Sequence, residues 1–110
     1  MPTINDQTML LVMTTITDID KGKLLARQII EKQLAACCNI VPGITSIYRW
    51  KNELCEDQEC LVVMKTTETR YIQLSKFIKQ QHPYDTPELI ALPVTHSTQE
   101  YLSWVTKETS

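Results

Sequence analysis

The 110-residue chain contains only two glycines, and this scarcity limits the phosphate-binding loops that it can form. Glycine-rich loops bring backbone N–H groups close to phosphate, and neither a Walker loop nor a Gly-x-Ser-x-Gly turn occurs in the sequence. A His-Glu-x-x-His pair is absent too. The chain therefore lacks the signatures of P-loop nucleotide hydrolysis, of serine hydrolases and of zinc proteases.

Long apolar segments and long runs of like charge are also absent. The first apolar run, residues 9–13, is much shorter than a secretory segment of roughly 7 to 15 residues or a membrane-spanning helix of about 20. The formal net charge is -2, and the 11 basic and 13 acidic residues are interspersed. We therefore expect a cytoplasmic protein that binds neither a membrane nor nucleic acid.

Four cysteines, Cys37, Cys38, Cys55 and Cys60, are present in a chain without an export signal. A secreted protein of this size could use them as a disulfide framework, but in a reducing compartment thiols are the expected form. Cys37 and Cys38 are adjacent in a predicted strand, so their side chains point to opposite faces and cannot readily share one metal ion. We expect packed, reduced thiols.

Hydrophobic periodicity predicts a single domain over residues 9–110, preceded by a flexible N-terminal arm of residues 1–8. The expected elements are, in order, a strand at 9–13, a helix at 19–34, a kinked strand at 37–50, a strand at 60–66, a helix at 68–81, a strand at 88–95, and a short helix that follows a capping box at 97–100. Right-handed crossovers place both main helices on one face of a four-stranded antiparallel sheet. The predicted fold is α+β, a ferredoxin-like β-α-β-β-α-β sandwich with an extra C-terminal helix.

The strands are apolar on both alternations, which predicts a second buried face. Leu61 and Val63 alternate with Val62 and Met64, so whichever pair faces the helices leaves the other pair on the opposite side of the sheet. Self-association is the commonest way to cover such a face.

Five separated segments resemble the CutA family, the divalent-cation tolerance proteins. They are residues 34–37 (LAAC), 42–50 (PGITSIYRW), 65–67 (KTT), 82–88 (HPYDTPE) and 101–104 (YLSW). The resemblance implies a homotrimer whose architecture is similar to that of the PII signalling proteins. It also implies a role in tolerance of divalent metal ions such as copper, and no enzymatic reaction.

The resemblance also bears on a metal site. Metal-carrying members of the family use a cysteine at the end of the first strand and two histidines before Pro-Tyr, where this chain has Thr14 and Gln81-His82. His82 and Glu88 are left as candidate ligands for a copper or zinc ion, with a third ligand from another subunit. Alternatively, His82 caps the end of its helix and Glu88 pairs with a basic group across the trimer.

The same resemblance gathers further polar and aromatic residues near the subunit clefts: Arg49, Trp50, Lys65, Tyr84, Thr86, Tyr101 and Trp104. They could bind a small molecule, as in a PII-like sensor, or they could hold the trimer together, since interfaces favour tyrosine, tryptophan and arginine. A purely structural or adaptor trimer is the third possibility. The acidic residues of segment 53–59 are expected to form a solvated hairpin tip rather than a cation site.

Overall fold

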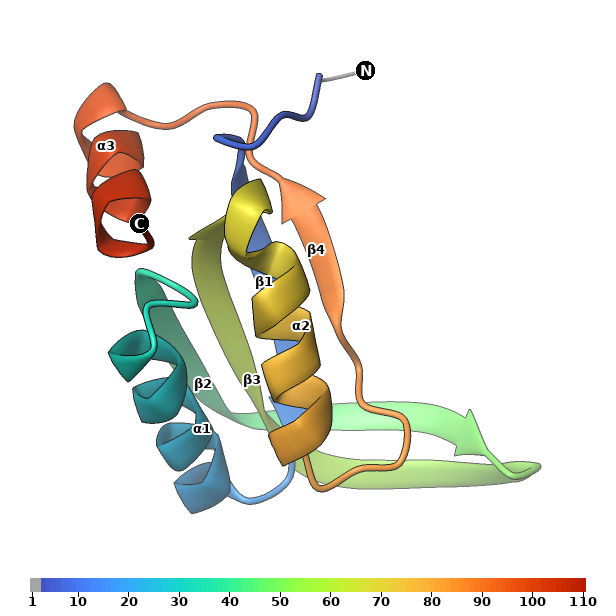
Figure 1. Cartoon of the computed structure of the whole chain (residues 1–110). Helices are drawn as coiled ribbons and strands as arrows, with labels where there is room; N and C mark the ends of the chain where they lie inside the picture. The colour runs from blue at the N-terminus through green and yellow to red at the C-terminus, as the bar shows by residue number, and fades with distance from the viewer. Residues whose placement is uncertain (1–2) are drawn as a thin grey trace.

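The computed structural model describes residues 3–110 and contains one four-stranded sheet in the order β2-β3-β1-β4 (Figure 1). Its elements are β1 (Met9–Ile16), α1 (Ile19–Glu31), β2 (Cys37–Trp50), β3 (Glu53–Thr67), α2 (Glu68–Gln81), β4 (Ile90–Pro93) and α3 (Gln99–Glu108). All three pairs of neighbouring strands are antiparallel. The predicted ferredoxin-like α+β fold with an additional C-terminal helix is confirmed.

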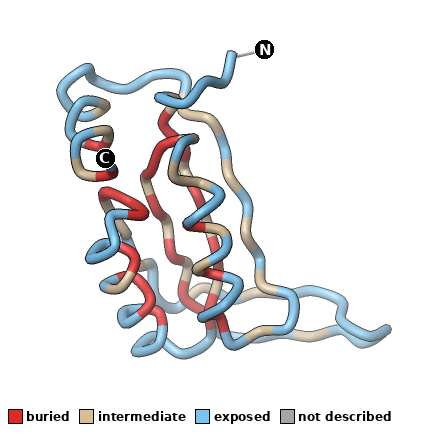
Figure 2. The backbone as a smooth tube through the Cα atoms, in the orientation of Figure 1, coloured by how far each residue is buried: buried red, intermediate tan, exposed pale blue. Residues whose placement is uncertain are grey.

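The main core lies between the sheet and the helices α1 and α2. Val12, Val62 and Met64 occupy alternate strand positions and are completely buried, as are Ile29 of α1 and the α2 residues that face the sheet. Figure 2 shows this as buried backbone on the facing sides of strands and helices. The period of two in the strands and the period of 3.6 in the helices therefore select the same interior.

The opposite face of the sheet is only partly covered. Leu61 and Val63 of β3 are half-buried, and Ile90 and Leu92 of β4 are about half exposed, at 47% and 50%. Helix α3 covers one end of this face, where Val105 packs with Met9 and Ala36. A large part of the second apolar face predicted from the sequence therefore remains exposed in a single chain.

Strands β2 and β3 form a long hairpin that extends beyond the body of the domain (Figure 1). Lys51 and Asn52 connect them with φ angles of 50° and 66°, the left-handed pair that a tight two-residue hairpin turn requires. A register shift between Val41 and Ile44 marks a bulge, and Gly43 adopts φ 70° there. The predicted kink at Pro42-Gly43 is thus confirmed.

Strand β3 begins at Glu53, seven residues before the predicted start. Acidic residues disfavour a strand by intrinsic propensity, but here they pair in register with β2, as in Ser46 opposite Asp57 and Ile47 opposite Glu56. The predicted start of the strand was therefore wrong, because pairing with an adjacent strand overrides local propensity. Glu53, Glu56 and Asp57 are exposed, as expected for a solvated hairpin tip, whereas Glu59 is buried.

The ends of the helices follow recognisable capping chemistry. Asp18 accepts hydrogen bonds from the backbone N–H groups of Asp20 and Lys21 at the start of α1. Helix α1 ends at Glu31, three residues earlier than predicted, because Gln33 adopts φ 58° and the N–H of Leu34 bonds back to the carbonyl of Ile29. Helix α2 has the predicted bounds, 68–81.

The remaining boundaries differ from prediction by a few residues. The N-cap of α3 is Thr98, whose side chain accepts from the N–H of Tyr101, rather than the Ser97 of a capping box. Strand β1 continues to Ile16, because Thr14 and Thr15 pair with β3. Strand β4 spans only 90–93, because its register with β1 covers four residue pairs.

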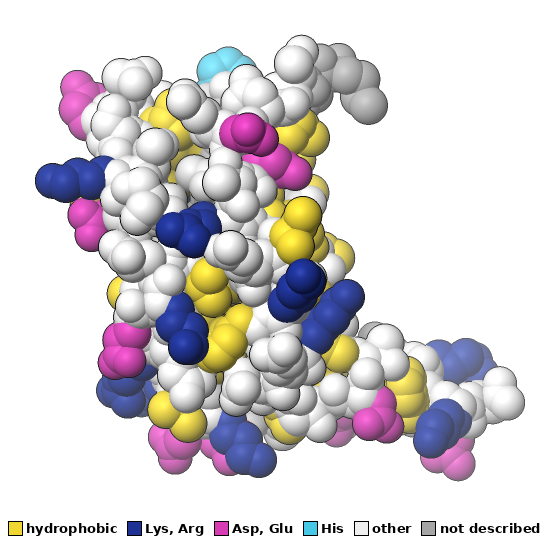
Figure 3. All heavy atoms as spheres, viewed as in Figure 1, with side chains coloured by type: hydrophobic (Ala, Val, Ile, Leu, Met, Phe, Trp, Pro, Cys, Tyr) yellow, Lys and Arg dark blue, Asp and Glu magenta, His cyan; other side chains and the backbone are white. Residues whose placement is uncertain are grey.

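Part of the N-terminal arm is bonded to the domain. Residues 1 and 2 lie outside the described residues, but the carbonyls of Asp6 and Thr8 accept from the N–H groups of Thr69 and Glu68. None of the helices in the described part of the chain is both long and apolar enough to span a membrane. Basic and acidic side chains alternate over the helical side of the molecule without a large patch of one sign (Figure 3).

Candidate functional site

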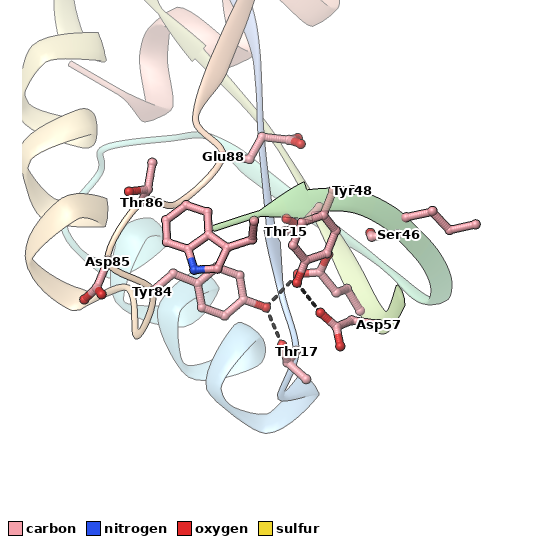
Figure 4. Close-up of a pocket in the computed structure, with 12 residues that line it drawn as sticks. Thr15, Thr17, Ser46, Tyr48, Asp57, Tyr84, Asp85, Thr86 and Glu88 are labelled. Carbon is pink, nitrogen blue, oxygen red and sulfur yellow. Dashed lines mark hydrogen bonds between the residues drawn. The ribbon is translucent and has the colours of Figure 1, made fainter. Parts of the chain in front are cut away.

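A cavity of about 620 Å³ lies between the β2–β3 hairpin and the loop that connects α2 to β4. It is lined by Thr15, Thr17, Ser46, Ile47, Tyr48, Trp50, Asp57, Glu59, Tyr84, Asp85, Thr86 and Glu88, most of which are labelled in Figure 4. The volume falls within the range of roughly 300 to 1,000 Å³ that is usual for small-molecule sites.

The hairpin residues that line the cavity are brought together because side chains alternate between the two faces of a strand. Ser46, Tyr48 and Trp50 project from one face of β2, and Asp57 and Glu59 project from the same face of β3. Ser46 is directly opposite Asp57, and Tyr48 is one diagonal away from it. Two aromatic rings and two carboxylates are therefore brought together by a backbone ladder rather than by a loop.

Two tyrosine–carboxylate pairs fix polar groups in the cavity. The hydroxyl of Tyr84 donates to Oε2 of Glu59 at 2.6 Å and also contacts the hydroxyl of Thr17. The hydroxyl of Tyr48 donates to Asp57 (Figure 4). Burial, followed by the bond to Glu59, raises the pKa of Tyr84, and the bond to Asp57 raises the pKa of Tyr48 to about 12. Both phenols therefore remain protonated donors at neutral pH.

His82 connects the α2–β4 loop to the first strand. It is 7% exposed, its Nε2 lies 2.8 Å from the carbonyl oxygen of Thr15, and its Nδ1 accepts from the N–H of Tyr84 at 3.2 Å. An N–H can donate only to an unprotonated nitrogen, so the proton is on Nε2 and is donated to Thr15. Both ring nitrogens thus form hydrogen bonds, and His82 holds the backbone of Tyr84 in a fixed position relative to β1.

This arrangement bears directly on the predicted metal pair. His82 has no free lone pair for an ion in this conformation, whereas Glu88 is an exposed carboxylate at the cavity. Within residues 3–110, no group of three or more His, Cys, Asp or Glu side chains is arranged to hold a metal ion. Thr14, at the position where a metal-carrying relative would have cysteine, is fully buried among the helix-facing strand residues. The residues present do not fit a copper or zinc site within one chain.

The structure brings together four of the predicted site residues, places His82 beside them through its bonds to Thr15 and Tyr84, and separates the other four. Trp50, Tyr84, Thr86 and Glu88 line the same cavity. These four lie apart from the cavity. Lys65 donates to the side chain of Asn39, Tyr101 and Trp104 form a tilted ring pair on α3 with centroids 5.6 Å apart, and Arg49 is exposed on the hairpin.

Sequence reasoning missed Tyr48, Asp57 and Glu59 as cavity residues. A signal was available, because the alternation that puts Tyr48 and Trp50 on one face of β2 also puts Asp57 and Glu59 on one face of β3. To predict that these residues of β2 and β3 lie next to each other also requires the register of the hairpin, which depends on the bulge between Val41 and Ile44. The bulge shifts every cross-strand pair beyond it, and its size cannot be read from the sequence.

None of the four cysteines forms a disulfide within the described residues. Cys37, Cys38, Cys55 and Cys60 are free thiols, and burial raises the pKa of Cys38 to about 12. Cys60 donates to the carbonyl of Ile16 in the core. These free and at least partly buried thiols agree with the prediction of packed cysteines, since a buried thiol behaves as a small apolar group.

Comparison with known proteins assigns the family. The sequence model of the CutA1 divalent ion tolerance proteins matches residues 10–108. The divalent-cation tolerance protein CutA of Thermus thermophilus is 44% identical over 98 residues, which are 89% of this chain and 95% of that protein. The chloroplastic protein CutA of Arabidopsis thaliana is 40% identical over 91% of this chain but only 55% of its own length.

Solved structures agree with the sequence comparison. The divalent cation tolerance protein Cut A1 of Thermus thermophilus superimposes with a TM-score of 0.90 at 42% identity, covering 93% of this chain and 99% of that chain. The periplasmic divalent cation tolerance protein CutA of Archaeoglobus fulgidus gives a TM-score of 0.90 at 26% identity, with coverage of 93% and 99%. The resemblance seen in the five sequence segments is confirmed, and the chain belongs to the CutA1 family of divalent ion tolerance proteins.

Proposed function

We propose that the protein acts in divalent-cation tolerance as a non-enzymatic homotrimer. The observation that carries the proposal is the apolar surface that one chain leaves exposed. Leu54 on the hairpin is 78% exposed, and Ile90 and Leu92 on the open sheet face are 47% and 50% exposed. Large apolar surfaces of this kind are normally covered by a partner, most often by further copies of the same chain.

The hairpin supports assembly for a second reason. An isolated two-stranded hairpin is marginally stable in water, yet the tip half of this one extends away from the body of the domain (Figure 1). Strands β2 and β4 are also the two edges of the sheet, with backbone groups available for pairing. Contacts with neighbouring chains would stabilise both the hairpin and the edges.

Native mass spectrometry tests the trimer directly. Three copies per particle are expected, and a stable monomer at low concentration would contradict the proposal. Leu92→Glu and Leu54→Glu should reduce assembly, because each introduces a charge into an apolar contact. Ile72→Glu is the matched control, since Ile72 is 66% exposed but lies on α2 in the helical layer; it should leave the particle mass unchanged.

A copper or zinc ion is part of the proposal only with ligands from more than one chain. Glu88 supplies one exposed carboxylate, whereas His82 would have to give up its bond to Thr15 or to Tyr84. Glu88→Ala should therefore lower the metal affinity that is measured by titrating the trimer with copper or zinc. His82→Ala should mainly reduce stability, because it leaves the partly buried carbonyl of Thr15 and the N–H of Tyr84 without these partners.

A small-molecule sensor similar to PII proteins is the second candidate, and the cavity favours it. Trp50, Tyr84, Thr86 and Glu88 line a space of ligand size that one chain already forms. A thermal-shift screen with metabolites tests this candidate, because a ligand that binds only the folded state raises the melting temperature. A flat response would favour a structural role.

For location we propose the cytoplasm. Four thiols without a disulfide are consistent with a reducing compartment, although the family also includes proteins named chloroplastic and periplasmic. Fluorescence microscopy of a tagged chain, with cell fractionation as a second measurement, tests the assignment.

A further inference from the structure

The charge in the cavity is of one sign. Asp57 and Glu59 reach it from β3, and Asp85 and Glu88 reach it from the α2–β4 loop. No lysine or arginine is among the described residues that line it, although the ammonium group of Lys51 lies over a tryptophan ring of the lining. Carboxylates around a hollow surface produce a negative potential that is stronger than on a flat surface, because the low-dielectric walls focus the field. The cavity is therefore suited to a cation rather than to a phosphate or a carboxylate ligand.

Glu59 is the most buried of the carboxylates that line the cavity. It is 8% exposed, and among the described residues only its Oε2 accepts a hydrogen bond, from the neutral hydroxyl of Tyr84. A buried carboxylate is costly unless an opposite charge or several donors satisfy it. The other oxygen of Glu59 is not among the buried atoms that lack a partner within the described residues, so it is open to a positively charged group in the cavity.

The aromatic lining favours an organic ammonium ion over a bare metal ion. Trp50, Tyr48 and Tyr84 contribute rings to the wall, and ring faces attract ammonium groups within about 6 Å of their centroids. The Trp50 ring already has such a neighbour, since Nζ of Lys51 lies 5.9 Å from its centroid. The carboxylates, by contrast, form no cluster able to hold one metal ion within residues 3–110.

We propose that the cavity binds a small organic cation with two or more ammonium groups, a linear polyamine. The cavity volume of about 620 Å³ accommodates such a chain, and carboxylates distributed around the wall match separated positive charges better than a single ion. This inference rests on the second candidate function and names its ligand class. In Figure 4, Glu88 and Asp57 lie at different parts of the rim, with the Tyr48 ring between them in this view.

Isothermal titration calorimetry with spermidine as probe tests the proposal, with uncharged 1,8-octanediol and Mg²⁺ as control probes. Saturable binding is expected for spermidine and not for octanediol, and excess Mg²⁺ should not abolish it. Trp104→Phe leaves Trp50 as the only tryptophan, so its fluorescence should change over the same concentration range. Octanediol binding as tight as spermidine, or no saturable spermidine binding, would overturn the proposal.

Two charge-neutralising variants separate a local site from general attraction. Glu88→Gln should weaken spermidine binding roughly two- to fivefold, the effect of losing one exposed ion pair. Glu31→Gln removes the same charge from an exposed residue at the end of α1, outside the cavity lining, and it should change the affinity by less than twofold. Equal losses in both variants would refute the site. Native mass spectrometry of the same samples reports the trimer independently, so failure of the ligand and failure of the assembly are distinguishable.

Discussion

Thr14 and Thr66 are two completely buried threonines on neighbouring strands whose hydroxyls differ in hydrogen bonding. Both face the helices, at even-numbered positions of β1 and β3. Oγ1 of Thr66 donates to the carbonyl of Leu34 at 2.7 Å, whereas Oγ1 of Thr14 has no partner among the described residues. Replacement by valine, which keeps the shape and removes the hydroxyl, should therefore change stability in opposite directions.

The magnitude follows from the cost of burying a hydroxyl. An unsatisfied buried polar group costs about 1–3 kcal/mol, so Thr14→Val should increase the free energy of unfolding by about that amount. Thr66→Val loses a net hydrogen bond and leaves the Leu34 carbonyl unsatisfied, which should lower stability by about 1–3 kcal/mol. Each 1 kcal/mol corresponds to roughly 4–8 °C in Tm for a domain of about this size.

Urea unfolding followed by circular dichroism measures both variants. The protein concentration must be the same in every sample, because assembly makes apparent stability concentration-dependent. If Thr14→Val is destabilising, or if both variants lose the same stability, the Thr14 hydroxyl is satisfied and the reasoning fails.

Three further predictions concern the cavity and α1. Tyr84→Phe should lower stability by about 1.5–3 kcal/mol, because it removes the donor to the buried Glu59 carboxylate. The pKa of Tyr48 is raised from 10.0 to about 12 by Asp57, so its contribution to stability is complete below pH 10 and is lost as the pH rises towards 12; absorbance titration of phenolate should show this late ionisation. Gly22→Ala should lower stability by about 1–3 kcal/mol, because the added Cβ would lie 3.0 Å from a β1 side chain.

Each of the three has its own control. Tyr71→Phe changes a tyrosine that packs on the core outside the cavity and should be nearly neutral. Asp57→Asn should lower the pKa of Tyr48, since it removes the negative charge that accepts the hydrogen bond of the phenol. For Gly22→Ala, the outcome that would contradict the prediction is an increase in stability, which helix propensity alone would give. It would show that the side chain of Ile16 can move to make room for the added Cβ.

The element order and the buried layer were predictable from the sequence because they depend on periodicity. Helix α2 was placed over its full length, since proline after His82 prevents continuation. The end of α1 was less predictable, because Gln33 in the left-handed region is a rare choice that intrinsic preference does not indicate.

The cavity was only partly predictable. Trp50, Tyr84, Thr86 and Glu88 came from the family resemblance, and the structure brings them together. The acidic half of the site, with Glu59 at its centre, needed the strand register, which is a long-range property of the fold. The role of His82 also depended on tertiary contacts, because its partners are set by the position of β1.

The alternation of the hairpin has a consequence for how its length can vary. Adjacent residues such as Tyr48 and Arg49 serve opposite surfaces, so inserting one residue between the bulge and the turn would exchange the two surfaces and turn the aromatic rings away from the carboxylates. Insertions of two residues leave each side chain on its original face of the hairpin. The turn at Lys51-Asn52 is not part of the strand alternation, so a change in its length does not exchange the two faces. Length changes in relatives that keep the cavity should therefore occur in even steps along the strands or be confined to the turn.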